Sequence, residues 1–476
     1  MPTMFKAEDL YFMGDSTAIG ANVGDFSFPR LLAERIYRIS VGTRYSLIVA
    51  REFNESAGEV LIPYSAGFIP DINSYKGHLG LPKDNLKDGS NSVQPVFEDQ
   101  ANMYKSYAGV ELVEGSGIIH SMFLDLEGNA WATGANGDGQ LCLGNQVDKF
   151  VPHKVALSEK VVDIAIGAKH TLLLTKTGKV FACGSNNRGQ LGLGEDLSQT
   201  NEPVRITELN PVESISAGME HSLIKTSDAL YVFGSNEFGQ LCTNETIGGN
   251  VYTPRSLPTI DEDLVKTFTA ISQSTFVLHK NGTVDACGRN NFGQLGDGTN
   301  TDSSYSSNIG ADIPEMAHVV LVGKGPSSHS GFFHTDSGYV YATGLNANGQ
   351  LGLGDFEDRN VPTRSAFSQR DGVLEIGTAV THTLTLGESG LACPATENNC
   401  LPGGCDGVCS GASGIIGDGS CKDGEEACVD LTGIVGTDSV RILMCYLPLS
   451  KFILSQLFRP QVPWGTGLLR GRGQYW

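Results

Sequence analysis

The chain of 476 residues has no uninterrupted apolar run of about 18 residues, so the sequence predicts no membrane span. The best candidate, 442–458, is broken by Pro448 and Lys451. Basic residues are few: 33 Lys and Arg against 53 Asp and Glu give a net charge of −20. Such a surface repels phosphate backbones, so we expect no direct binding of nucleic acid. The first twelve residues contain no apolar stretch behind a charged one, which indicates a cytoplasmic location rather than secretion.

Motifs for catalysis and for metal binding are missing too. The sequence contains no Cys-x-x-Cys, Gly-x-Ser-x-Gly, His-Glu-x-x-His or phosphate-loop lysine motif. The acidic stretches GDGSNS and GDGTNTDSS lack the spaced carboxylates and the final Glu of a calcium loop. We therefore expect no catalytic residue, no metal and no cofactor.

Glycine, in contrast, is abundant, with 60 residues, and much of it belongs to an internal repeat. Five segments align directly, among them GKVFACGSNNRGQLGLGE from Gly178 and GYVYATGLNANGQLGLGD from Gly338. Two weaker copies begin at Asp9 and Gly58, which makes seven. The glycine before Gln-Leu, or its equivalent, marks the six copies from the second onwards: Gly77, Gly139, Gly189, Gly239, Gly293 and Gly349.

Each copy reads as short β-strands without any helical period. Apolar and polar residues alternate over five or six positions before a Thr-Gly or Ser-Asp turn, and the next strand follows at once. Four such strands form a sheet that cannot bury both faces alone, and radial stacking of sheets solves this problem. The sequence therefore predicts an all-β, seven-bladed β-propeller over 1–390. Strand 9–14 should pair with 381–386 and close the ring, although 390–393 could compete for this place.

The repeat resembles that of the regulator of chromosome condensation family, whose unit reads G-x-V-Y-x-x-G-x-N-x-x-G-Q-L-G followed by A-x-G-x-x-H-S-L. The resemblance covers residues 9 to about 387, and Gly-Gln-Leu occurs five times intact. It implies a propeller that usually serves as a protein-binding scaffold, and several relatives are exchange factors for Ran-like small GTPases. Those factors use one propeller face and a small β-hairpin insertion. No exchange residue of this kind can be placed in the sequence.

Residues that recur at one phase of the repeat are expected to be structural. Five histidines precede Ser or Thr and should bond an adjacent loop or blade, with Tyr45 and Ser274 in the same place elsewhere: His120, His170, His221, His329 and His382. The asparagines should bond their own turns: Asn136, Asn186, Asn236, Asn290 and Asn346. The glutamines should tie blade to blade: Gln140, Gln190, Gln240, Gln294 and Gln350. Cys142, Cys183, Cys242 and Cys287 occupy apolar strand positions, so we expect buried free thiols.

Function should then lie in the irregular surface loops. Arg188, Phe238 and Phe292 occupy equivalent positions before Gly-Gln-Leu on consecutive blades, and Arg beside aromatic residues is typical of an interface centre. We predict that these three residues bind a protein partner, either a small GTPase or a basic protein surface. The alternative is that each Phe covers the neighbouring blade. Two insertions, 82–107 and 243–266, are further candidates, and we expect a monomer.

Seven of the eleven cysteines crowd into 393–445, which predicts a separate Cys-rich, irregular segment at 391–440. A period of 19 residues relates Cys409 to Cys428 there, and the cysteine spacing favours disulfides over zinc. Disulfides would point to a secreted or cell-surface protein, against the missing signal. The last segment, 441–476, is expected to be unstructured, with a weak membrane-surface segment as the alternative.

The sequence as a whole favours a non-enzymatic protein-interaction scaffold. The first alternative is a guanine-nucleotide exchange factor for a small GTPase. The second is an extracellular Cys-rich adhesion or wall-associated protein, which depends on the tail alone. The plant ultraviolet-B photoreceptors that share this fold need a cluster of tryptophans. This chain has only Trp131, Trp464 and Trp476, two of them outside the propeller, so we expect no photoreceptor role.

Overall fold

The structure is a computed structural model of the whole chain. It describes residues 8–15, 25–34, 36–54, 58–69, 72–73, 75–86, 89–96, 110–115, 120–244, 247–257, 264–306, 308–365, 373–388, 427–430 and 443–446. Contacts divide the chain into two units, Met1–Ala392 and Cys393–Trp476, and each is described by itself.

Described residues of the first unit form seven four-stranded antiparallel sheets. Sheet 1 contains β3 (Ile36–Gly42), β4 (Tyr45–Asn54), β5 (Gly58–Ile69) and β6 (Gly89–Pro95). Sheet 2 contains β7 (Val110–Gly115), β8 (His120–Asp125), β9 (Ala130–Gly134) and β10 (Lys149–Lys154). Sheet 3 contains β11 (Val161–Ile166), β12 (His170–Thr175), β13 (Val180–Ser185) and β14 (Gln199–Arg205). Sheet 4 contains β15 (Val212–Ala217), β16 (His221–Thr226), β17 (Leu230–Ser235) and β18 (Asn250–Ser256).

Sheet 5 contains β19 (Val265–Ile271), β20 (Ser274–His279), β21 (Val284–Gly288) and β22 (Ser303–Ser306). Sheet 6 contains β23 (Val319–Val322), β24 (Ser330–Thr335), β25 (Val340–Gly344) and β26 (Arg359–Arg364). The closing sheet has the order β27 (Val373–Thr378), β28 (His382–Glu388), β1 (Glu8–Asp15) and β2 (Asp25–Glu34). Two 3-10 helices, η2 (Lys83–Asn85) and η4 (Pro314–His318), lie in connections.

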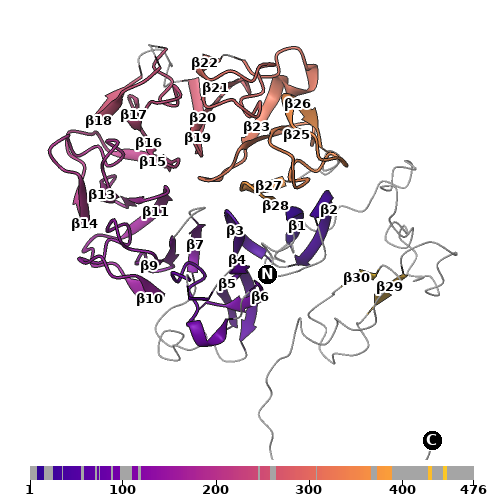
Figure 1. Cartoon of the computed structure of the whole chain (residues 1–476), viewed down its shortest axis with the longest axis horizontal. Coiled ribbons are helices and arrows are strands. Elements are labelled where there is room, and N and C mark those ends of the chain that lie inside the picture. The colour runs from indigo at the N-terminus through magenta and orange to yellow at the C-terminus, as the bar shows by residue number, and fades with distance from the viewer. Residues whose placement is uncertain are drawn as a thin grey trace, which may run out of the picture. The chain divides into compact units, whose positions relative to one another are not determined.

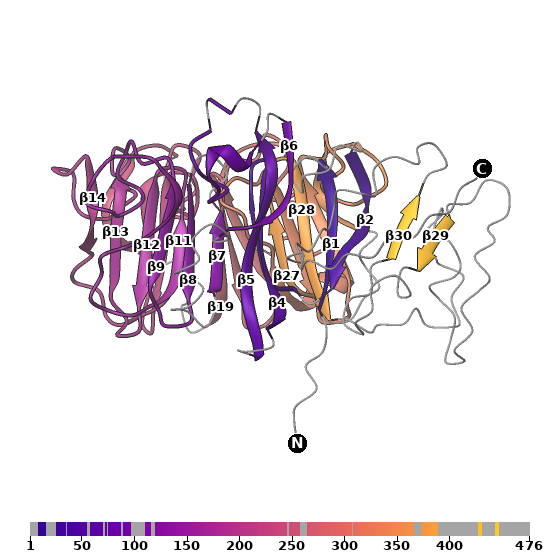
Figure 2. The same ribbon diagram turned by 90° about the horizontal axis from the view of Figure 1, so that it is seen from below.

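The sheets are arranged in a ring, with β11, β15 and β19 on its inner side and β14, β18 and β22 at the periphery (Figure 1). We call the region along the axis of the ring, lined by the inner strands, the central channel. The all-β propeller predicted from the repeat is confirmed. Seen from the side, the strands run between two rims (Figure 2). We call the side with the turns between second and third strands the hairpin rim. The other side, with the Gly-Gln-Leu loops, is the loop rim.

Alternating side chains make each sheet apolar on both faces, which is why the sheets stack. In β12, Leu173 belongs to a core shared with β8 of sheet 2, whereas Leu172 and Leu174 belong to a core shared with β16 of sheet 4. All three are at most 3% exposed. Burial of a leucine contributes about 1.5–3 kcal/mol, so stacking of neighbouring sheets is the main source of stability.

The ring closes as predicted. β1 pairs antiparallel with β28, from Glu8 opposite Glu388 to Gly14 opposite His382. The first described strand thus completes a sheet whose inner strands come from the end of the repeat region, and this pairing removes two open edges. The competing segment, 390–393, lies outside the described residues.

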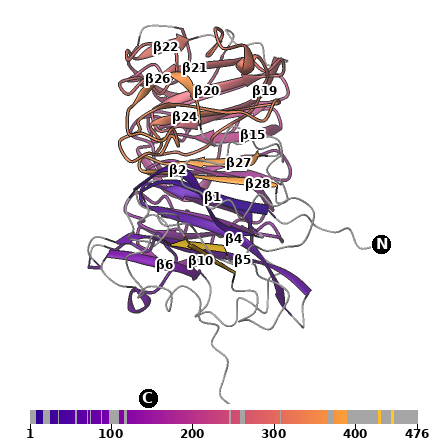
Figure 3. The ribbon, with the colours of Figure 1, turned by 90° about the vertical axis from the view of Figure 1, so that its right-hand side faces the viewer.

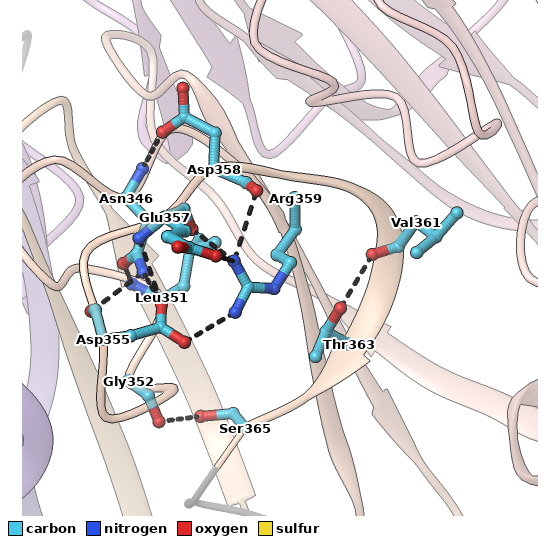
Figure 4. A network of polar contacts seen from close by, with 10 residues as sticks. All are labelled: Asn346, Leu351, Gly352, Asp355, Glu357, Asp358, Arg359, Val361, Thr363 and Ser365. Atoms are coloured by element: carbon cyan, nitrogen blue, oxygen red, sulfur yellow. Dashed lines mark hydrogen bonds and ion pairs between the residues drawn. The ribbon is translucent and has the colours of Figure 1, made fainter.

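The predicted asparagine turns are confirmed, and Figure 4 shows the one in sheet 6. Asn346 Oδ1 accepts from the Leu351 N–H at 2.9 Å, and its Nδ2 donates to the Asp355 carbonyl at 3.0 Å. Asp358 accepts the Asn346 N–H at 2.7 Å, and Arg359 donates to Asp355 at 2.6 Å. One side chain thus holds both ends of the loop between third and fourth strands, as Asn136, Asn186 and Asn290 do elsewhere. The side chain of Asn236 makes only the bond at the turn, where it accepts the Leu241 N–H, among the described residues.

The glutamines tie sheet to sheet, but mostly through their main chain. The Gln140 carbonyl accepts from Thr171 Oγ1 of the next sheet at 2.8 Å, and the Gln190 carbonyl accepts from Ser222 Oγ at 2.8 Å. Gln240 and Gln294 repeat this with Thr275 and Thr343. Their side chains instead accept N–H groups of their own turns. Only Gln350, among these five, reaches the next sheet by its side chain, to the Val380 carbonyl at 2.7 Å.

Four of the five histidines bond the next sheet, as predicted. Nε2 lies 2.9–3.1 Å from a hydroxyl oxygen in each pair: His120–Thr171, His170–Ser222, His221–Thr275 and His382–Ser46. The assignment of His329 to this set is wrong. Ser330, not His329, pairs with the strand glycine (Gly344) that faces the histidine elsewhere. The connection before β24 is longer, so His329 falls one position earlier, on the loop rim.

The prediction of free thiols in the propeller is wrong. Cys142 is bonded to Cys183 and Cys242 to Cys287, with Cα–Cα distances of 5.5 and 5.4 Å. One bond joins sheet 2 to sheet 3, and the other joins sheet 4 to sheet 5. The reason lies in repeat geometry, because the residue after Gly-Gln-Leu contacts the third strand of the next sheet. Where this residue is a glycine, a Cβ added to it would contact the same strand of the next sheet: Phe233 for Gly192 and Thr343 for Gly296.

In the second unit, β29 (Ala427–Asp430) pairs antiparallel with β30 (Leu443–Tyr446), with Cys428 opposite Cys445. The rest of the predicted segments 391–440 and 441–476 lies outside the described residues, so their character stays a prediction.

Candidate protein-interaction surface

The three predicted partner residues stand at the tip of one kind of turn on the loop rim. The N–H groups of Arg188, Phe238 and Phe292 each donate to the Gln Oε1 two residues on, at 2.9 Å. The following glycine has a positive φ at all six positions from Gly77 to Gly349 that mark the second and later copies, for example 87° at Gly189. Sequence thus fixes the turn and leaves the tip side chain variable.

Each tip side chain leans toward the next sheet. Arg188 is exposed, and its guanidinium lies 3.7 Å from Glu220 and 3.7 Å from Glu237, both on sheet 4. These ion pairs are long and open to solvent, so they contribute little to stability. They do, however, place the arginine next to the following tip, because Glu237 precedes Phe238.

The two phenylalanines are half-buried and each has an aromatic or cationic neighbour on the next sheet. The Arg289 guanidinium lies 5.0 Å from the ring centroid of Phe238. Its Nη1 also donates to Gln273 Oε1 at 2.7 Å. Phe292 stacks on His329, with centroids 5.4 Å apart and ring planes at 18°. Burial, and then the charge of Arg289, lower the pKa of His329, so this imidazole is neutral at pH 7.

These contacts make a continuous strip over sheets 3 to 6, which we call the tip strip: Arg188, Glu237, Phe238, Arg289, Phe292 and His329. The structure thus brings together the three predicted residues on one rim. It also shows that each phenylalanine covers part of the neighbouring sheet, which was the alternative interpretation. The partner-binding role of the three residues stays a prediction.

Sequence reasoning missed half of the strip, namely Glu237, Arg289 and His329, and also Glu220 beside it. Glu220, Arg289 and His329 come from the loops that meet the tips across the sheet boundary, and only the ring geometry makes them neighbours. A signal was present at the equivalent boundary between sheets 2 and 3, where tip residue Asp138 lies 3.4 Å from Lys169. Opposite charges at the tip of one copy and just before the strand histidine of the next copy therefore predict an ion pair across the sheet boundary, as between Arg188 and Glu220.

One hairpin extends past the others on the opposite, hairpin rim. β4 and β5 pair as far as Asn54 opposite Gly58, five residue pairs beyond the point where the equivalent hairpins of sheets 2 and 3 end. The extension is visible in Figures 2 and 3. The other predicted loop candidates contain η2 and β6 in 82–107 and β18 in 243–266, while their remaining parts are described only partially.

The described residues contain no group of three or more His, Cys, Asp or Glu side chains placed to hold a metal ion. Within the same part of the chain, no helix is long and apolar enough to cross a membrane.

Comparisons with known proteins give the same fold. Ultraviolet-B receptor UVR8 of Arabidopsis thaliana is 30% identical over 268 residues, which cover 54% of this chain and 58% of the receptor. The regulator of chromosome condensation of Mus musculus is 28% identical over 309 residues, which cover 60% of this chain and 70% of the mouse protein. The match thus spans little more than half of the receptor's length.

Solved structures support the fold at low sequence identity. Yeast Prp20, in a structure with Kap60, has a TM-score of 0.66 at 21% identity and covers 80% of this chain and 89% of its own. Human WBSCR16 has a TM-score of 0.65 at 20% identity, over 80% of this chain and 100% of its own. A family model described as RCC1-like domain matches residues 72–393, which is more than half of the chain. The chain therefore belongs to the RCC1-like domain family, the regulator of chromosome condensation family that its repeat resembles.

Proposed function

We propose that this protein is a non-enzymatic interaction scaffold whose seven sheets act as blades of one ring and whose tip strip binds a protein partner. The observation that carries this is the strip itself, in which half-buried aromatic rings and arginines lie side by side on a rigid frame. Arg and aromatic residues are the usual hot spots of protein interfaces.

The partner is expected to carry a basic surface. The chain has a net charge of −20, so a basic partner would be attracted over long range and would associate more slowly as salt increases. A related yeast protein, Prp20, is described with binding properties to Gsp1p and histones, which is consistent with a protein partner for this fold.

The two disulfides favour an oxidising compartment over the cytoplasm, because structural disulfides are rare where thiols are kept reduced. Of the locations considered from the sequence, a secreted or cell-surface one fits best. This supports a scaffold role over action on a small GTPase inside the cell.

Replacement of Phe238 and Phe292 by Ser tests the scaffold role. We expect the double variant to lose binding to a partner that the wild-type chain binds, while its stability falls by only about 1–2 kcal/mol, because exposed cation–π and ring contacts are worth about 0.5–1.5 kcal/mol each. Binding by surface plasmon resonance and thermal melts measure the two effects. Leu126→Ser, on the hairpin rim and 45% exposed, is the matched control. A loss of several kcal/mol with binding retained would mean that the rings only cover sheet edges.

A second candidate function is nucleotide exchange on a small GTPase, and the extended β4–β5 hairpin favours it, because exchange factors of this family use a hairpin insertion. Release of a fluorescent guanine nucleotide from a panel of small GTPases tests it. We expect no acceleration. Marked acceleration by the wild-type chain that is lost when residues 52–60 are replaced by a short turn would establish exchange and refute the first proposal.

A further inference from the structure

We propose that the central channel contains a binding site for a small organic carboxylate, between the ammonium group of Lys324 and the hydroxyls of Thr267 and Thr269. The site lies where sheets 5 and 6, the closing sheet and sheet 1 meet around the channel. It is separate from the tip strip and does not depend on the proposed protein partner.

Irregular pairing of the inner strands introduces polar residues into the channel wall. Every first strand has a break in register after its first residue, for example between Ile36 and Arg38 in β3 and between Val373 and Glu375 in β27. A bulge of this kind re-aims the side chains that follow it. Arg38, Thr267 and Glu375 are the residues directly after the break in three of these strands.

A cavity of about 170 Å³ results. Its polar lining consists of Arg38, Thr267, Thr269, Lys324 and Glu375, and its apolar lining includes Leu374. Since these residues come from four sheets, the cavity exists only in the closed ring. An otherwise dry cavity of about 150 Å³ holds benzene, so the ligand should have about six to ten heavy atoms.

The charges in the cavity are unequal. Glu375 is already compensated, because Arg38 Nη1 lies 3.7 Å from its Oε1 and the Ile39 N–H donates to its Oε2 at 3.2 Å. Lys324 is exposed and lines the cavity, and no carboxylate lies within ion-pair distance of it among the described residues. The charged lining of the cavity therefore consists of two cations, Arg38 and Lys324, and one carboxylate, Glu375, and this excess of positive charge favours an anion.

The backbone holds this lysine in place. Its N–H donates to the Ile376 carbonyl at 2.9 Å and its carbonyl accepts the Thr378 N–H at 2.7 Å. The backbone of Lys324 thus forms a β-bridge with Gly377, which fixes the point from which the side chain starts between sheet 6 and the closing sheet. It is also close enough to the channel centre to act on Asp163 of β11, whose pKa is raised by burial and lowered again by Lys324 and Arg38.

The hydroxyls supply the second half of the site. Thr267 and Thr269 lie two residues apart on β19, so they share one face of the strand. No partner for either hydroxyl occurs among the described residues. A carboxylate could accept from both hydroxyls and from the ammonium, while an apolar body contacts Leu374. Phosphate-bearing nucleotides and folded peptides exceed the volume.

Ligand-observed ¹⁹F NMR on the full oxidised chain tests the proposal, with 4-fluorobenzoate as the probe. 4-Fluorobenzamide is the uncharged control of similar shape, and 4-fluorobenzylamine is the cationic one. We expect saturable binding of the benzoate alone. Lys324→Gln should weaken it about tenfold or more, because a charge-assisted hydrogen bond is lost, and Thr269→Val should weaken it several-fold. Lys169→Gln, which replaces an exposed lysine on the loop rim outside the cavity, should leave the affinity within twofold of wild type.

Melting temperatures of the variants show whether each one folds, and Lys324 is exposed, so its replacement should not unfold the ring. The proposal is overturned if the amide binds as tightly as the benzoate, if only the amine binds, if none of the probes binds, or if Lys324→Gln retains wild-type affinity in a folded protein.

Discussion

The buried histidines show how single residues link neighbouring sheets. Thr171 Oγ1 donates its one proton to the Gln140 carbonyl, so the hydroxyl must accept from His120 Nε2. The same order of donors holds for His170 and Ser222 and for His221 and Thr275. Each of these histidines therefore carries a proton on Nε2. The Nδ1 atoms of His170 and His221 are buried and have no partner among the described residues.

These histidines make the protein sensitive to acid. Burial lowers the pKa of His120, His170 and His221 to about 3 and that of His78 to about 4, against an ordinary value of 6.5. Below pH 6.5 the unfolded chain therefore binds more protons than the folded one, and stability is lost as pH falls toward 4.

His170→Gln should reduce this dependence on pH. We expect the free energy of unfolding to change with pH less steeply between pH 6 and 5, by about 1 kcal/mol per pH unit, since one titrating group has been removed. Denaturant titrations at several pH values measure the slope. His153→Gln, an exposed histidine on β10, is the control and should leave the slope as it is. An unchanged slope in the His170 variant would mean that the imidazole titrates normally in the folded state.

At the scale of strands and turns, ring closure depends on β1. Its seven pairs with β28 are the contacts that join the two ends of the repeat region. Deletion of residues 1–15 should lower the melting temperature by many degrees, because the closing sheet loses its third strand and exposes an edge. Deletion of residues 1–7 alone, which keeps β1, is the control. Equal melting temperatures of the two deletions would mean that another segment closes the ring.

The disulfides are a second device at this scale. Cys142 and Cys242 have φ of 57° and 53°, where other copies have glycines such as Gly192, with φ 67°. A non-glycine residue costs about 1–2 kcal/mol in this conformation. A disulfide that closes a loop of 41 residues stabilises the folded protein by about 4 kcal/mol, because it lowers the conformational entropy of the unfolded chain. The net effect is stabilising.

Cys142→Gly with Cys183→Thr copies the pair Gly296 and Thr343 found between sheets 5 and 6 and removes only the bond. We expect the variant to be less stable than the oxidised wild type by about 2–3 kcal/mol. A reductant should destabilise the wild type further than the variant, which keeps only the second disulfide. Denaturant midpoints with and without dithiothreitol measure this. A reductant that leaves the wild type unchanged would contradict the pairing.

Much at this scale was predictable because each copy of the repeat carries its own signals. Gly-x-Asn-x-x-Gly-Gln-Leu specifies a turn by local hydrogen bonds, and the phase of strand 9–14 within the repeat indicated its partner. Contacts between different copies of the repeat were harder to predict from the sequence. The disulfides follow from pairing one repeat phase with another in the next copy, and Cys142 and Cys242 stand where most copies have glycine. His329 was misplaced because a longer connection shifts the residue before Ser330 out of phase.

Considered as a whole molecule, the propeller separates stability from recognition. Asparagines and glutamines that recur at one position of each copy hold the turns, and the sheets pack through shared apolar faces. Two disulfides also join sheet 2 to sheet 3 and sheet 4 to sheet 5. The variable tip residues then lie on a frame that tolerates their change. The channel cavity and the tip strip both arise only when residues from different sheets meet, which no single copy of the repeat reveals.

Site-specific photo-crosslinking can show whether the tip strip is the surface that contacts a protein partner. A benzophenone amino acid is placed at Phe238 and, in a second protein, at Leu126 on the hairpin rim, and each oxidised chain is irradiated with a basic partner to which the wild type binds. We predict a cross-linked complex from position 238, diminished by added salt, and none from position 126. Cross-linking from position 126 with none from 238 would contradict it.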